Sequence, residues 1–333
     1  MATDLTGQTF GSYRLIELLG RGGMASVYRG YQESIDRSVA IKVLPHEFLH
    51  DPNFSQRFVA EARTLAKMTH PAILPLYDFG TANEVPYIVM PLMTGGTLAD
   101  RMASGALPFA EVARLFTPIA DALDYAHSLN VVHRDIKPSN ILFDHRGQPF
   151  LADFGIAKAL EASTQLTGTA IVGTPDYMSP EQARGEPLDG RSDIYSFGVM
   201  AYQCLTGDTL FKATTPIAVM LKHATETPPP IRQARRDVPQ AAVHLWHVDH
   251  AHTPAHAHRR ADRLALPLLR RFLRSQFRLG NFNRRCERAR LHRWRILHSS
   301  SGDGLVRVEQ RAERCLSRCT DQRQRPPTQR RLQ

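Results

Sequence analysis

Residues 132–140 read Val-His-Arg-Asp-Ile-Lys-Pro-Ser-Asn, and three of them carry side chains suited to one reaction. The Asp135 carboxylate can orient a hydroxyl group or accept its proton. Lys137, two residues on, can lie beside a transferred phosphoryl group and offset its charge. Asn140, five residues past Asp135, offers an amide oxygen to a hard divalent cation. The stretch therefore predicts a site where a hydroxyl group, a phosphoryl group and a metal ion meet.

Two further motifs follow at a coherent spacing. Asp153-Phe154-Gly155 begins thirteen residues after Asn140, and its carboxylate is a second candidate ligand for Mg²⁺. Residues 173–181 then read Gly-Thr-Pro-Asp-Tyr-Met-Ser-Pro-Glu, and Asp193 opens an almost wholly apolar stretch, which predicts a buried helix.

A glycine-rich segment lies near the N-terminus, between two expected strands. Glycines in such a hairpin let backbone N–H groups approach phosphate oxygens without obstruction by side chains. Ala25 stands where the usual pattern has a third glycine. Alone, the segment fits a hairpin with no ligand equally well. Its residues are Leu19, Gly20, Arg21, Gly22, Gly23, Met24, Ala25, Ser26 and Val27.

A lysine occupies the next expected strand, in Val39-Ala40-Ile41-Lys42. Burying its charge among apolar residues is costly unless an anion meets it. Phosphate oxygens and Glu61, on the following helix, are the expected partners. The alternative is a lysine at a strand edge whose ammonium group reaches solvent.

The order of expected elements predicts the fold class. Strands come first and helices later, which favours an α+β chain with a small sheet-rich lobe followed by a larger helical lobe. We expect strands at 13–19, 26–31, 38–44, 74–78 and 87–90, and helices at 51–68, 111–129, 194–205 and 216–225.

These motifs, in this order, resemble those of protein kinases. Lys137 and the Gly173-Thr174 pair are typical of the Ser/Thr branch, and the style of the segment is similar to bacterial Ser/Thr kinases of the eukaryotic-like type. The resemblance covers residues 13–240 and implies a two-lobed protein kinase fold. It implies an N-lobe at 13–91, a C-lobe at 92–240, and an N-terminal extension at 1–12.

The resemblance also implies residue roles. ATP would lie under Leu19, Val27 and Ala40 and bond to backbone around Pro91 and Met93, with Met90 as gatekeeper. Lys42, held by Glu61, would contact phosphates, and Asn140 and Asp153 would bind Mg²⁺, for which Mn²⁺ is an alternative. Asp135 and Lys137 would act on the acceptor hydroxyl, which Thr174 helps to select. Arg134 would pair with a phosphate on Thr167 or Thr169; the alternative is that these are ordinary loop residues.

Composition divides the chain in two. Residues 241–333 hold 21 Arg, no Lys, 4 Asp and 3 Glu, a net charge of +14, so residues 1–240 carry −4 of the overall +10. The tail has no periodic apolar pattern. Kinases of this class have an arginine between their last helices that pairs with the glutamate matching Glu181, and no arginine of the tail aligns with it. We expect an out-of-frame or disordered tail and a C-lobe lacking its last helices, with Glu181 buried and unpaired. The alternative is a genuine tail.

The function expected from these features is ATP-dependent transfer of phosphate to Ser and Thr of proteins, with autophosphorylation of the loop. The alternative is an impaired kinase-like scaffold. A homodimer through the N-lobe occurs in such kinases.

No specific nucleic-acid partner is expected. A zinc site is not expected either, because the tail's His and Cys lack paired short spacings. Four cysteines, no signal-peptide pattern and no membrane span predict a cytoplasmic chain, although an intact relative could be membrane-anchored.

Overall fold

The computed structural model describes residues 4–22, 25–44, 54–154 and 175–238. The chain divides into two compact units, 1–281 and 282–333, and every described residue belongs to the first. Gly23, Met24, Thr167, Thr169 and Thr174 lie outside the described residues, as does the Arg-rich tail.

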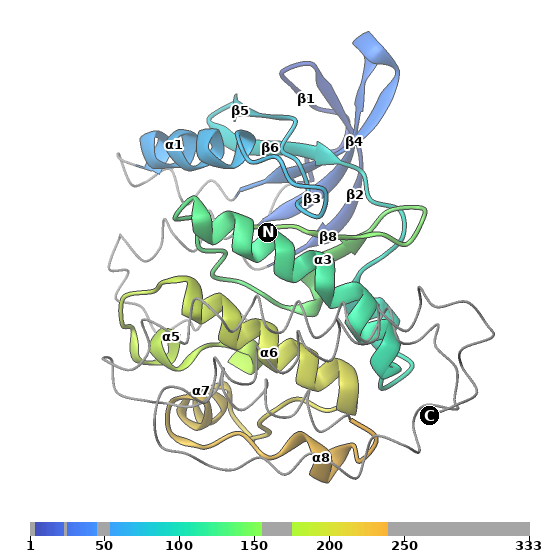
Figure 1. Ribbon diagram of the computed structural model, residues 1–333. Helices are drawn as coiled ribbons and strands as arrows, with labels where there is room; N and C mark the ends of the chain where they lie inside the picture. Colours follow the sequence, from blue (N-terminus) through green and yellow to red (C-terminus); the bar gives the residue numbers. More distant parts are fainter. Residues whose placement is uncertain (1–3, 23–24, 45–53, 155–174, 239–333) are drawn as a thin grey trace, which may run out of the picture. The chain divides into compact units, whose positions relative to one another are not determined.

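The N-terminal part is a six-stranded antiparallel sheet with the strand order β1-β2-β3-β4-β6-β5 (Figure 1). Its strands are β1 (Thr9–Phe10), β2 (Tyr13–Arg21), β3 (Ser26–Gln32), β4 (Arg37–Val43), β5 (Asp78–Ala82) and β6 (Val85–Pro91). A short 3-10 helix, η1 (Glu33–Ile35), joins β3 to β4. The expected N-terminal extension thus contributes β1, the edge strand.

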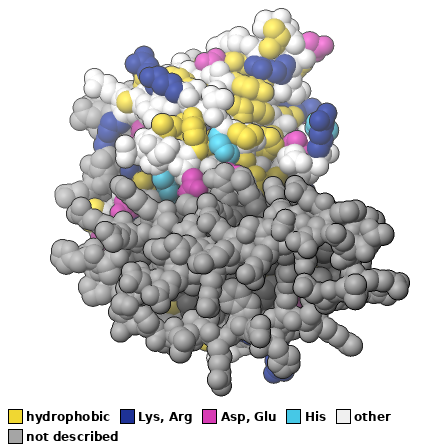
Figure 2. Space-filling view, viewed as in Figure 1, with side chains coloured by type: hydrophobic (Ala, Val, Ile, Leu, Met, Phe, Trp, Pro, Cys, Tyr) yellow, Lys and Arg dark blue, Asp and Glu magenta, His cyan; other side chains and the backbone are white. Residues whose placement is uncertain are grey.

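Two separate apolar clusters stabilise this sheet. One contains Phe10, Tyr28, Ile41 and Tyr87, and the β1 segment helps to cover it. The other contains Phe54 and Phe58 of α1 (Phe54–Ala66), which packs beside β5 (Figure 1). Apolar side chains also gather on the visible surface over the strands, with Lys and Arg around them (Figure 2).

The C-terminal part is mainly helical. It contains α2 (Leu98–Met102), α3 (Phe109–Ser128), α5 (Pro180–Arg184), α6 (Gly190–Thr206), α7 (Pro216–Thr225) and α8 (Ile231–Ala234). A two-stranded sheet, β7 (Ile141–Phe143) with β8 (Pro149–Leu151), and the 3-10 helices η3 (Pro138–Asn140) and η4 (Pro175–Tyr177) complete it. Its largest core packs α3 against α6, where the rings of Phe116 and Phe197 lie 4.8 Å apart.

The α+β class with a sheet-rich N-lobe and a helical C-lobe is confirmed. The strand expected at 74–78 is wrong, because β5 begins only at Asp78. The apolar residues before it instead bond to β8: Ile73 bridges Leu151, and Leu74 N–H donates to the Leu151 carbonyl at 2.9 Å. This contact ties the segment between α1 and β5 to the C-lobe.

Candidate active site

The loop between α3 and β7, expected to be the catalytic loop, places two polar side chains against Asp135. Asn140 Nδ2 donates to the backbone carbonyl of Asp135 at 2.7 Å and to its carboxylate Oδ2 at 3.0 Å. Lys137 Nζ lies 2.8 Å from the same Oδ2. The η3 turn produces this cluster, because Asn140 N–H bonds to the Lys137 carbonyl at 3.0 Å and folds Asn140 back toward Asp135.

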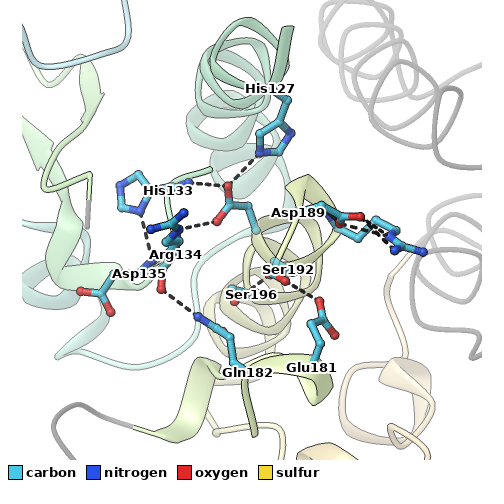
Figure 3. A network of polar contacts seen from close by, with 11 residues as sticks. His127, His133, Arg134, Asp135, Glu181, Gln182, Asp189, Ser192 and Ser196 are labelled. Carbon is cyan, nitrogen blue, oxygen red and sulfur yellow. Dashed lines mark hydrogen bonds and ion pairs between the residues drawn. The ribbon is translucent and has the colours of Figure 1, made fainter. Parts of the chain in front are cut away.

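A single buried carboxylate fixes the backbone of this loop. Asp193, in the first turn of α6, accepts hydrogen bonds from the backbone N–H of His133 at 2.7 Å and of Arg134 at 2.8 Å. His127 Nε2 donates to it at 2.8 Å (Figure 3). Arg134 has a left-handed backbone, with φ of 68°, which a non-glycine residue keeps only when its surroundings hold it. The Asp193 network supplies that restraint.

His133 supports the loop from within the core. Its Nδ1 accepts from the Asp135 N–H at 3.3 Å, so the ring proton is on Nε2, which donates to the Ala152 carbonyl at 2.9 Å. Its ring lies 4.6 Å from that of Phe154. Burial lowers the pKa of His133, and the Asp193 charge opposes that shift. The imidazole is therefore a neutral link between Asp135 and the residue that precedes Asp153.

Asp153 and Lys42 meet across the two lobes. Lys42 Nζ on β4 lies 2.8 Å from Asp153 Oδ1. Asp153, like Arg134, has a left-handed backbone, with φ of 60°. The structure thus places a cation and a carboxylate, which the sequence put more than a hundred residues apart, in direct contact.

The expected Lys42–Glu61 pair is not formed between these two described residues. Glu61, on α1, lies nearer to two arginines: burial raises its pKa, and the charges of Arg134 and Arg57 oppose the shift. Lys42 instead satisfies its charge with Asp153. The placement of α1 relative to β4 decides the partner, and sequence spacing does not contain that information.

The glycine-rich hairpin is closed at its described ends. Gly20 pairs with Val27 and Arg21 with Ser26 in the β2–β3 ladder, and Gly22 N–H bonds to the Ala25 carbonyl at 2.8 Å. A Cβ at Gly20 would meet no atom within 4 Å, so its backbone is open to a ligand. Leu19, at the start of this hairpin, is a large apolar side chain that is 47% exposed.

The residues expected around an adenine ring are adjacent in space. Ala40 of β4 pairs with Met90 of β6, and Val39 with Pro91. Met90 packs against the cluster that contains Phe54 and Phe58, which places it on the α1 side of the sheet. Met93 follows in the segment that connects β6 to α2.

The protein kinase domain family matches residues 13–264. This chain belongs to that family. The match continues past residue 240, where the sequence predicted the end of the domain, so that boundary stays a prediction. The family membership implies that ATP and a divalent metal ion are used.

Several relatives of this kinase domain come from bacteria. The serine/threonine-protein kinase PrkC of Bacillus subtilis is 37% identical over 253 residues, which cover 76% of this chain and 39% of PrkC. PknB of Mycobacterium leprae is 39% identical over 232 residues, which cover 68% of this chain and 37% of PknB. The crystal structure of the Mycobacterium tuberculosis PknI kinase domain has a TM-score of 0.64 and 27% identity, covering 81% of this chain and 98% of that chain. The resemblance to bacterial Ser/Thr kinases is confirmed, and the chain spans under two fifths of these two curated relatives.

Ser179 and Gln182, at the start of α5, hold the backbone of the expected catalytic loop. Gln182 Nε2 donates to the Arg134 carbonyl at 2.9 Å (Figure 3). Its Oε1 accepts from the Ser179 N–H at 2.9 Å. Ser179 Oγ in turn accepts from the Gln182 N–H, which makes a capping box at the start of α5. The Ser-Pro-Glu-Gln pattern predicts this box, but its bond to Arg134 depends on the tertiary fold.

Glu181 was expected to be buried and unpaired, and the expected burial is wrong. Glu181 is only half-buried, and its Oε1 accepts from Ser192 Oγ at 2.5 Å (Figure 3). No cation pairs with it among the residues that the structure describes. A half-buried carboxylate with a hydroxyl donor does not carry the large cost of a fully buried, unpaired charge.

His127, Gln182 and Ser192 were not predicted from the sequence. None belongs to a spacing that signals chemistry, and each acts through a neighbour. The sequence holds one trace of the His127 contact, a glycine at position 190, where α6 begins. A Cβ at that position would lie 2.8 Å from His127 Nδ1. The close approach requires glycine at that position.

Proposed function

We propose that this kinase domain transfers the γ-phosphoryl group of ATP to Ser and Thr hydroxyl groups of proteins. The observation that carries the proposal is the placement of two clusters: Lys42 with Asp153, and Asp135 with Lys137 and Asn140. These are the residue types that phosphoryl transfer needs, a base, two cations and hard metal ligands. The Ser/Thr assignment is supported by the similarity to PrkC and PknB, which are serine/threonine-protein kinases, and by Lys137.

Asp135 is the residue proposed to receive the substrate hydroxyl. One of its oxygens, Oδ2, is held by Asn140 and Lys137, which fixes the carboxylate for an incoming O–H donor. Orientation of the hydroxyl and acceptance of its proton both need that fixed geometry. Lys137 supplies a positive charge beside the same oxygen, where negative charge on the phosphoryl group can be offset.

The side chains fit a divalent cation with oxygen ligands. Both hydrogen bonds that Asn140 makes to Asp135 use Nδ2, so its amide oxygen is the atom left for a metal. Asp153 supplies a carboxylate. We propose Mg²⁺ as the natural ion, with Mn²⁺ able to replace it. When bound, the ion would neutralise charge on the phosphate oxygens.

The binding-module alternative is not favoured, because every polar residue that the chemistry needs is intact. Lys42, Asp135, Asn140 and Asp153 are all unsubstituted relative to the motif. Protein substrates are proposed on family grounds. Dimerisation through the N-lobe is a proposal that rests on the resemblance, and location in the cytoplasm is one that rests on the cysteine content and the lack of a signal-peptide pattern. Within the described residues no helix is long and apolar enough to cross a bilayer.

Transfer of radiolabel from [γ-³²P]ATP to casein and histone tests the function. We expect Mg²⁺-dependent label on phosphoserine and phosphothreonine and none on phosphotyrosine. Asp153→Asn is the inactive control, since it removes a metal ligand and the partner of Lys42. Asp144→Asn, in the turn between β7 and β8, is the matched active control. Calorimetric ATP binding without any transfer would favour the scaffold instead.

A further inference from the structure

His223 is a fully buried polar side chain that the proposed chemistry does not use. It lies on the inner face of α7 with Val219, whereas Ile217 and Leu221 of the same helix are more than 60% exposed. The inner face packs against α5 and η4. A histidine at this position is unexpected, because an apolar residue would fill the same core space without polar atoms to satisfy.

The ring makes one hydrogen bond and two aromatic contacts. Nδ1 lies 2.8 Å from the hydroxyl of Tyr195 on α6. The Phe211 ring is 5.0 Å away and nearly perpendicular, and the Tyr195 ring is 5.7 Å away. Nε2 is buried and makes no hydrogen bond of good geometry among the described groups, and the backbone of Asp176 acts on the ring only as a weak acceptor that raises its pKa against the effect of burial.

The His223–Tyr195 pair supports the segment on which a protein substrate would lie. The backbone of Asp176, in η4, is close enough to affect the pKa of His223. The same segment is held from α6 by Ser196 Oγ, which donates to the Tyr177 carbonyl at 2.6 Å, and by the Tyr177 hydroxyl, which donates to Gln203. Because η4 directly follows Thr174 in the chain, its position governs the residues expected to face the acceptor hydroxyl.

We propose that His223 and Tyr195 are positioning residues for the protein acceptor: their hydrogen bond links α7 to α6 beneath η4 and so sets the affinity for the Ser/Thr-bearing substrate without affecting ATP. This inference rests on the proposed kinase function. The acceptor and ATP should respond separately, since Lys42 and Asp153 pair with each other away from His223 and Tyr195, whereas η4 packs directly on α7.

Steady-state kinetics of the full chain test the inference. The acceptor is a peptide of residues 161–171, which contains Thr164, Thr167 and Thr169. Tyr195→Phe and His223→Phe each delete the hydrogen bond and keep the ring. We expect either to raise KM for the peptide about 3- to 10-fold, with KM for ATP unchanged. The double variant should equal a single one, because both remove the same bond.

Lys222→Ala is the matched control on the same helix, since its Nζ pairs with the exposed Glu226 at 3.4 Å instead of facing η4. An unchanged peptide KM, equal shifts for peptide and ATP, or additive effects would each overturn the inference. If His223→Phe does not fold, Tyr195→Phe, which deletes one oxygen atom, decides alone. A wild-type chain that binds Mg-ATP but labels neither peptide nor casein contradicts the proposed function itself, which is a separate result.

Discussion

Asp135, the proposed catalytic residue, is held by residues close to it in the sequence. Its carboxylate oxygen Oδ2 receives a hydrogen bond from Asn140 and an ion pair from Lys137, and its backbone N–H bonds to His133. These three partners come from the same nine-residue stretch. The Asp193 carboxylate, from a distant part of the chain, holds the backbone of that stretch.

Replacement of Asp135 by Asn should reduce kcat by about 10²- to 10⁴-fold. An amide cannot accept the hydroxyl proton, and it loses the ion pair with Lys137. Binding of Mg-ATP, measured by calorimetry, should stay near wild type because the Lys42–Asp153 pair is untouched. Asp144→Asn serves as the control. Equal activity of the two variants would remove Asp135 from the mechanism.

The sequence predicted the residues of the site better than their partners. Asp135, Lys137 and Asn140 are close because a short turn brings them together, and such local geometry is readable from spacing. Lys42 was expected to meet Glu61, yet it meets Asp153. That choice depends on where α1 lies against β4, a tertiary property with no counterpart in the pattern of one chain.

His223 should make the protein sensitive to acid. Burial lowers its pKa from 6.5 to about 4. Above pH 6.5 the ring is neutral in both folded and unfolded chains and has no effect. Between pH 6.5 and 4 the unfolded chain binds a proton that the folded chain does not, so the free energy of unfolding falls by about 3 kcal/mol.

Urea titrations of wild type and His223→Phe at several pH values measure this difference. The wild type should lose about 3 kcal/mol more than the variant between pH 6.5 and 4, because other groups, including His133, titrate in both proteins. Parallel stability curves would mean that the buried ring is not the acid-sensitive group.

At the scale of elements, one arginine joins three segments of the C-lobe. Arg235, just after α8, donates from Nη1 to the carbonyl of Leu107 at 2.5 Å, before α3, and to that of Leu205 at 2.7 Å, near the end of α6. Carbonyls at a helix C-terminus carry partial negative charge, so the partly buried guanidinium is well matched to the Leu205 carbonyl. Ile231 and Val238 on either side are in the core.

Arg235→Ala should lower the free energy of unfolding by about 2–3 kcal/mol, since it leaves two carbonyls without their charged donor. Arg236→Ala, at the neighbouring exposed position, should change it by less than about 0.5 kcal/mol. Denaturant unfolding of both variants gives the comparison. If the two variants are equally stable, the hydrogen bonds of Arg235 contribute nothing measurable.

Long periodic elements were predictable and short ones were not. The helix expected at 111–129 is α3 (Phe109–Ser128), because its apolar positions repeat over five turns. The helices α2 and α8 and the strands β7 and β8 have five residues or fewer, which is too short for a period to emerge. The strand expected at 74–78 failed at its start, because Leu74 bonds to Leu151 of β8, whereas the Tyr77 N–H bonds to the Val89 carbonyl of β6.

At the scale of the whole molecule, Arg134 is the residue expected to pair with a phosphate on the proposed regulatory loop. Its backbone is fixed by Asp193 and Gln182, while its Nε is buried without a hydrogen-bond partner in the described part of the chain. A phosphate group carries the negative charge and acceptor oxygens that would satisfy such a donor.

Incubation with Mg-ATP should therefore add phosphate to Thr167 or Thr169, which mass spectrometry of the digested chain can locate. The Thr167→Ala/Thr169→Ala double variant should have several-fold lower activity on casein. Ser163→Ala, in the same loop, is the control. Unchanged activity of the double variant would show that Arg134 does not depend on these threonines.

The composition of the chain changes abruptly after residue 240. The chain is in register with the kinase fold at least to Val238, which is buried in the main core, and the family match continues to residue 264. Yet residues 241–333 have a net charge of +14 and no Lys, Met or Tyr. Codons for these residues are AT-rich, so GC-rich DNA read out of frame yields such a composition. We expect another reading frame after codon 240 to encode two amphipathic helices separated by an arginine that can pair with Glu181. Sequencing the gene tests this, and if neither other frame encodes such helices, the tail is a genuine part of the protein.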